Sequence, residues 1–114
     1  MDRILSARRA LWAIVALLLS SAPSLAAATV ETGRIIAEEN CARCHAIGRT
    51  GDSPHKDAPA FRDLSQRYPI DNLAEAFAEG LNVGHADMPE FRLTAEQTEA
   101  LLSYLQSIQD KSRR

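Results

Sequence analysis

Cysteine is scarce in this sequence: the 114 residues include only two, Cys41 and Cys44. Small exported domains often depend on several disulfides for their stability, and this chain cannot form a framework of that kind. A single bridge between residues three positions apart would close a loop too small to constrain the unfolded chain much. The two cysteines therefore need another purpose, and the domain needs another source of stability.

Strand signals are also nearly absent, since no stretch alternates apolar and polar residues with enrichment in β-branched side chains. Helical signals occur in three places instead, and the first covers about residues 30–40. The second covers 71–79, where Asp71 is expected to cap the N-terminus and Gly80 to end the helix. These patterns predict an all-α domain with three main helices.

The third helix has the clearest signals. Thr94 and Gln97 have the spacing of a capping box, and Lys111, Arg113 and Arg114 would favour the C-terminal end of the helix dipole. The apolar residues at helical spacing are Leu101, Leu102, Tyr104, Leu105 and Ile108. Two long irregular stretches, about 46–69 and 81–93, separate the three helices. Loops of this length in a compact domain usually wrap or bind something.

Tryptophan occurs once, as Trp12, inside a segment that we expect to be removed. Arginines at positions 3, 8 and 9 precede the apolar run 10–19, and small residues follow up to Ala28. This order is typical of a secretory signal peptide. An uncleaved anchor is the alternative, but ten apolar residues fall short of the roughly 18–20 that span a bilayer. We therefore predict a cleaved signal peptide, 1–28, with cleavage after Ala28 or alternatively Ala26, and one domain, 29–114.

The stretch NCARCHAIG, 40–48, holds both cysteines and a histidine directly after the second. A redox dithiol of the thioredoxin kind would need a βαβ unit, which the pattern lacks. Structural zinc would need two further ligands, and His55 and His85 lie far apart along the chain. C-x-x-C-H is instead the attachment signature of c-type haem. It predicts thioether bonds from Cys41 and Cys44 and ligation of iron by His45.

Methionine is equally scarce: apart from Met1, Met88 is the only one. It lies in the second irregular stretch and precedes Pro89, which fixes the chain direction. We expect Met88 to be the sixth ligand of the iron. His85 is a rival ligand, and an open sixth position is a further alternative.

With these motifs in place, the sequence resembles the class I c-type cytochromes, in particular the small single-haem bacterial members. The resemblance rests on four motifs in the order of the family: CARCH (41–45), APAF (58–61), MPEF (88–91) and LLSYL (101–105). It implies a small cytochrome c fold, with three main helices and long loops wrapped around one covalent haem c. It also implies that the carbonyl of Pro59 accepts a hydrogen bond from His45, and that Gly33 and Tyr104 lie where the first and last helices cross.

The resemblance further implies a one-electron carrier rather than an enzyme. Export of the chain places it in a bacterial periplasm, either free or as the small haem subunit of a dehydrogenase. A haem-based ligand binder or sensor, or a weak peroxidase, is the alternative if the sixth ligand is absent or labile. Leu73, Phe77, Leu81, Phe61 and Phe91 are expected to line the haem pocket.

Redox proteins such as a dehydrogenase, an oxidase or a reductase are the expected partners, through transient docking at the haem edge. No nucleic acid partner and no stable membrane insertion after signal cleavage are expected. The whole chain carries a formal charge of −2, yet Arg43, Arg49 and Arg92 flank the ligand motifs. We therefore predict a locally positive patch on an acidic protein.

Overall fold

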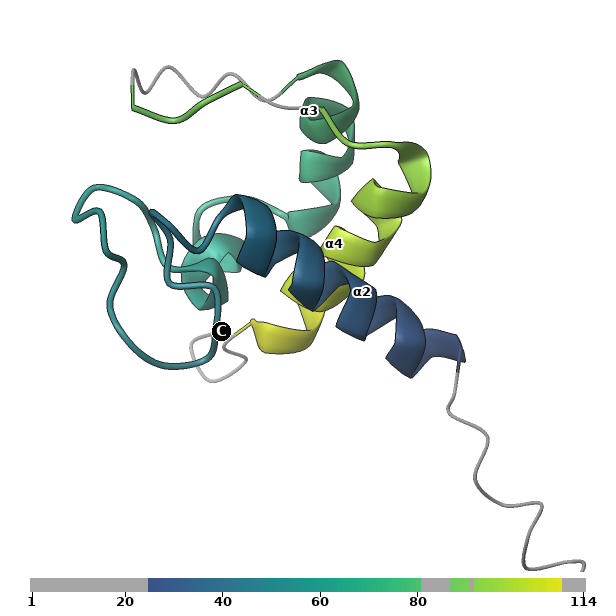
Figure 1. The fold of residues 1–114 in the computed structure, drawn as a ribbon, viewed down its shortest axis with the longest axis horizontal. Helices are drawn as coiled ribbons and strands as arrows, with labels where there is room; N and C mark the ends of the chain where they lie inside the picture. The colour runs from purple at the N-terminus through teal and green to yellow at the C-terminus, as the bar shows by residue number, and fades with distance from the viewer. Residues whose placement is uncertain (1–24, 81–86, 91, 110–114) are drawn as a thin grey trace, which may run out of the picture.

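The computed structural model describes residues 25–80, 87–90 and 92–109, which form helices joined by irregular segments (Figure 1). The described residues include three α-helices: α2 (Leu25–Asn40), α3 (Leu73–Glu79) and α4 (Ala95–Ile108). Two 3₁₀ helices lie between α2 and α3, η1 (Phe61–Gln66) and η2 (Ile70–Asn72). Within these described ranges there is no strand, so the predicted all-α class with three main helices is confirmed.

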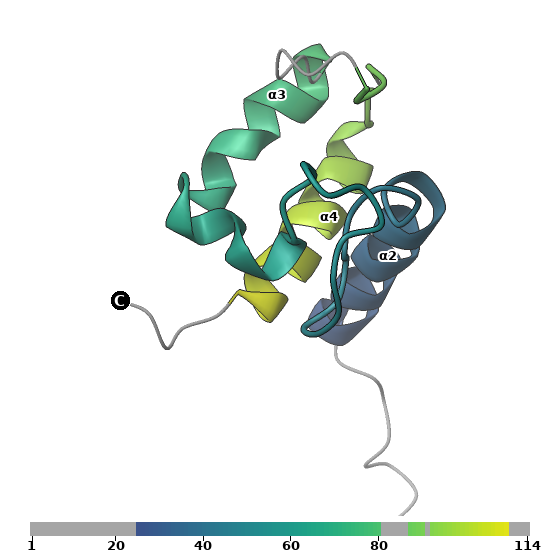
Figure 2. The same cartoon turned by 90° about the vertical axis from the view of Figure 1, so that its left-hand side faces the viewer.

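Helix α4 is the centre of the domain, because it packs against α2, α3, η1 and η2. Figure 2 shows α2 and α3 on opposite sides of α4, with the segment after Asn40 passing between them. Leu101 and Leu105 of α4 are the most fully buried large side chains among the described residues. The core extends from them to Ala37 of α2 and Phe77 of α3.

The crossing of α2 and α4 depends on Gly33. A Cβ atom built on Gly33 would lie 1.9 Å from the carbonyl oxygen of Ala100 and 2.8 Å from Cβ of Tyr104. Both distances are far below van der Waals contact, so only glycine lets the two helices approach this closely. The implied contact between Gly33 and Tyr104 is therefore present.

The start of α4 forms as its sequence predicts. The Thr94 hydroxyl accepts a hydrogen bond from the backbone N–H of Gln97, and the Gln97 side chain accepts one from the backbone N–H of Thr94. This capping box satisfies two backbone donors that a helix N-terminus leaves unpaired. The basic residues expected beyond the other end, Lys111, Arg113 and Arg114, lie outside the described residues.

The other two predicted helices differ in detail from the structure. Helix α2 begins at Leu25 rather than near Val30, because the run LAAATV has no helix-breaking residue. The expectation that Asp71 caps the second helix is wrong, since α3 begins after Asn72 and has no side-chain cap. The Asp71 carboxylate lies in η2 and accepts a hydrogen bond from Nε2 of Gln106 at 2.6 Å. Gly80 does end α3, at φ +101°, a conformation that favours glycine.

None of the described helices has the length and apolar character needed to cross a membrane.

Replacing Gly33 with alanine should lower the free energy of unfolding by about 1–3 kcal/mol or more, since that range is the usual cost of overpacking. The higher helix propensity of alanine, about 1 kcal/mol, cannot compensate, because the clash is with backbone atoms. Urea unfolding of the haem-loaded protein measures the effect.

Gly48→Ala is the matched control, since a Cβ at Gly48 would meet no atom within 4 Å. Equal stability of the two variants would contradict the close crossing of α2 and α4.

Candidate functional site

Cys41, Cys44 and His45 follow directly after α2 and form one tight turn. The backbone N–H groups of Cys44 and His45 both donate to the carbonyl of Cys41, at 3.1 and 2.9 Å. Cys41 is buried in the core cluster, Cys44 is half-buried, and neither is in a disulfide. The end of α2 therefore determines where all three side chains of the motif lie.

Burial raises the pKa of the Cys41 thiol to about 11. The thiolate is the reactive form of cysteine, so burial disfavours reaction of Cys41 once the chain has packed around it. We therefore expect any covalent chemistry at Cys41 to precede folding of the domain.

The imidazole of His45 is held by Pro59. Its Nδ1 lies 2.8 Å from the carbonyl oxygen of Pro59. A carbonyl can only accept a hydrogen bond, so Nδ1 carries the hydrogen, and in a neutral imidazole Nε2 then keeps its lone pair. The ring also packs against Phe61, with ring centroids 5.0 Å apart. The Nε2 lone pair of His45 is thus held in one orientation. Metal-ligating histidines are held in the same way when their other ring nitrogen donates a hydrogen bond.

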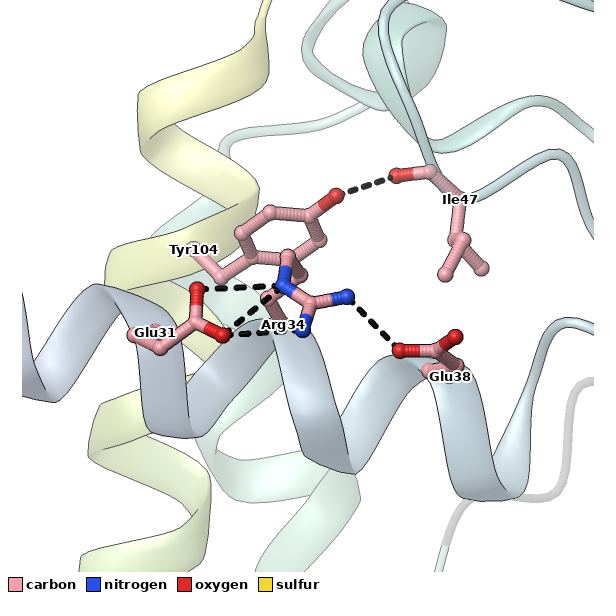
Figure 3. Close-up of polar contacts among 5 residues, drawn as sticks. All are labelled: Glu31, Arg34, Glu38, Ile47 and Tyr104. Carbon is pink, nitrogen blue, oxygen red and sulfur yellow. Dashed lines mark hydrogen bonds and ion pairs between the residues drawn. The ribbon is translucent and has the colours of Figure 1, made fainter.

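The segment around the motif is fixed at several further points. The backbone N–H of Ala46 donates to the hydroxyl of Ser53 at 3.0 Å, and its carbonyl accepts from the N–H of Phe61 at 2.9 Å. The hydroxyl of Tyr104, on α4, donates to the carbonyl of Ile47 at 2.9 Å (Figure 3). The chain after His45 is therefore anchored to both η1 and α4.

Figure 3 also shows three charged side chains of α2 near Tyr104, where Arg34 forms ion pairs with Glu31 and Glu38. These side chains are exposed, and such pairs contribute little to stability. The arginine is nevertheless neutralised locally and adds no free positive charge to the surface.

Met88 is half-buried and packs against the core cluster. The segment that contains it returns to α3, where the N–H of Leu93 donates to the carbonyl of Phe77 at 3.1 Å. His85, its rival as a ligand, lies outside the described residues.

His55 connects the two ligand segments, a role that sequence analysis did not assign. Its backbone N–H donates to the carbonyl of Cys44 at 3.1 Å, and its Nε2 lies 3.5 Å from a carboxylate oxygen of Asp87. Asp87 directly precedes Met88. No sequence pattern indicates this link, because the two residues lie on separate irregular segments.

Three of the expected pocket residues are described, and all contribute to the core. Phe61 and Phe77 are buried in the core cluster, and Leu73 is partly buried and packs against that cluster. Leu81 and Phe91 lie outside the described residues. In the described part of the chain, no group of three or more His, Cys, Asp or Glu side chains could hold a metal ion.

A comparison with protein-family models matches residues 30–109 to cytochrome c. The chain belongs to the cytochrome c family. Cys41 and Cys44 fit the C-x-x-C-H motif, and the family implies covalent haem c and haem-based electron transfer. Proteins of this family are typically electron carriers that meet redox partners transiently, rather than enzymes. Searches of curated proteins and of solved structures found no match.

The residues present fit a covalent haem c. The cytochrome c motif supplies two cysteines that are not in a disulfide and one histidine that hydrogen-bonds Pro59 through Nδ1 rather than Nε2. The two thiols belong to one turn of the chain, as attachment along one edge of a porphyrin requires.

Replacing Tyr104 with phenylalanine should lower the free energy of unfolding by about 1–3 kcal/mol, because it leaves the Ile47 carbonyl without its partner. Thermal or urea unfolding of the haem-loaded protein measures the loss. Tyr68→Phe, at the exposed second tyrosine, should leave the stability unchanged. If the Tyr104→Phe variant were as stable as the wild type, α4 would not anchor the segment after His45.

Proposed function

We propose that this member of the cytochrome c family is a periplasmic one-electron carrier with a single His/Met-ligated haem c. The observation that carries the proposal is the orientation of His45, whose Nδ1 donates to Pro59 and whose Nε2 is left to bind iron. Cys41 and Cys44 would hold the group covalently, and Met88 would supply the sixth ligand. When bound, haem iron alternates between ferric and ferrous states and so carries one electron at a time.

The remaining residues of the site adjust this chemistry without taking part in it. Phe61 and Phe77 are buried and exclude water from the core. An apolar surrounding disfavours the additional positive charge of the ferric state, and His/Met ligation likewise raises the reduction potential. If His45 and Met88 both bind the iron, no ligand position remains for a substrate, which favours a carrier over an enzyme.

Residues 1–28 are proposed to be the signal peptide that directs the chain to the periplasm. Helix α2 begins at Leu25, so cleavage after Ala28 removes its first residues and leaves a helix that starts at Thr29. The intact mass of the exported protein identifies the cleavage point.

Replacing Met88 with alanine tests the proposed sixth ligand. The ferrous wild-type protein should keep its optical spectrum under carbon monoxide, because His45 and Met88 would already occupy the positions where the gas could bind. The Met88→Ala spectrum should shift on exposure to the gas. A carbon monoxide shift in the wild type would instead favour the ligand-binding or sensor alternative.

Partner docking is proposed to involve positive charge near the ligand motifs. Arg43 lies between the two cysteines and is exposed, and Arg92 follows the Met88 segment and is also exposed. Arg49 is exposed too, but its guanidinium donates to the carbonyl of Ser107 on α4. Such charges mainly steer the encounter of redox proteins.

The double variant Arg43→Glu, Arg92→Glu should be oxidised severalfold more slowly than the wild type by ferricyanide, which is an anion. The difference should shrink in about 1 M salt, where charges are screened within about 3 Å. Stopped-flow absorbance measures both rates. Arg67→Glu is the control, since Arg67 is exposed but follows η1, outside the ligand motifs. If Arg67→Glu slowed oxidation by ferricyanide as much per charge changed as the double variant does, a local positive patch would be contradicted.

A further inference from the structure

Gln109 follows α4 directly and is buried, with 9% of its surface exposed. Its Oε1 accepts a hydrogen bond from the backbone N–H of Ser65 at 2.8 Å. Its Nε2 donates to the carbonyls of Phe61 and Leu105, at 2.8 and 2.7 Å. Both hydrogens of the amide are therefore used, and this one side chain joins the end of α4 to η1.

The residue that Gln109 holds is central to the surroundings of His45. The N–H of Phe61 donates to the carbonyl of Ala46, and its ring packs against the imidazole of His45. Pro59, whose carbonyl accepts from Nδ1 of His45, lies two residues before Phe61. The peptide groups on both sides of Phe61 are thus fixed, one by the His45 segment and the other by Gln109.

We propose that Gln109 is a positioning residue for the imidazole of His45. By holding the carbonyl of Phe61, it keeps the Pro59 carbonyl within hydrogen-bonding distance of Nδ1. This inference rests on the proposed role of His45 as an iron ligand. Gln109 lies 64 positions after His45 in the sequence. The inference nevertheless gives Gln109 an effect on the electronic character of His45 as a ligand.

The direction of this effect follows from the hydrogen bond. A carbonyl that accepts from Nδ1–H makes Nε2 a stronger base, and a stronger base favours ferric over ferrous iron. Loosening the bond therefore raises the reduction potential. Water entering a loosened core would favour the ferric charge and lower the potential, so a rise is specific to the weakened hydrogen bond.

The experiment compares haem-loaded Gln109→Leu with wild type and with Gln106→Leu. Gln106 is the matched control, because its side chain also ties α4 to a 3₁₀ helix, but the hydrogen bond is to Asp71 of η2 rather than to η1. We expect a higher reduction potential for Gln109→Leu. We also expect exchange of the His45 Nδ1 hydrogen, followed by NMR in the diamagnetic ferrous protein, to be at least tenfold faster. Gln106→Leu should leave both quantities at their wild-type values.

Gln109→Asn provides the test if Gln109→Leu does not fold. It keeps the amide but is one methylene shorter, so both effects should have the same sign and be smaller. Unchanged potential and exchange in a haem-containing Gln109 variant, with equal loss of stability in both oxidation states, would mean a purely structural role and overturn this inference alone. A wild-type protein without haem bands would overturn the proposed function, and this inference with it.

Discussion

The close contact of α2 with α4 at Gly33 is the constraint on which the rest of the structure depends. A single additional carbon atom there would lie 1.9 Å from the carbonyl oxygen of Ala100. Because Cys41 follows the last residue of α2 directly, the position of this helix determines where the cysteines and His45 begin. The crossing therefore does more than stabilise the core, since it sets the place of the C-x-x-C-H motif relative to α4.

The C-terminal half of α4 then holds the other side of the ligand segment. Tyr104 binds the carbonyl of Ile47, Ser107 accepts from Arg49, and Gln109 binds η1 at two points. The bonds from Tyr104 and Gln109 use backbone groups of irregular or 3₁₀ segments, which lack the regular pairing of a helix. The bond from Arg49 instead joins a side chain of the irregular segment to the backbone of α4. Irregular segments can be held rigidly only if such groups find partners, and here α4 and the residue that follows it supply three of them. A small domain with long loops can thereby keep an oriented histidine.

Sequence predicts the parts of this arrangement that depend on neighbours along the chain. The capping box at Thr94, the stop at Gly80 and the C-x-x-C-H motif are all local patterns, and each is present as expected. The resemblance to a known family supplied the bond between His45 and Pro59 and the contact at Gly33. The predictions from the sequence were wrong where a residue has a partner that is distant along the chain. Asp71 is a good helix cap by local rules, but its carboxylate binds Gln106, 35 positions away. Gln109 could not have been singled out, since its partners become neighbours only after the chain has folded.

The measurement that tests the account most directly is the optical spectrum of the wild-type protein, matured in a periplasm competent for haem attachment, in both oxidation states. We predict sharp c-type bands on reduction and, in the ferric state, the weak near-infrared band of an iron–methionine bond. Together these bands would support attachment through Cys41 and Cys44 and ligation by His45 and Met88. Haem bands without the near-infrared band would contradict Met88 as the sixth ligand, and a colourless protein would contradict the central claim that this fold holds a covalent haem.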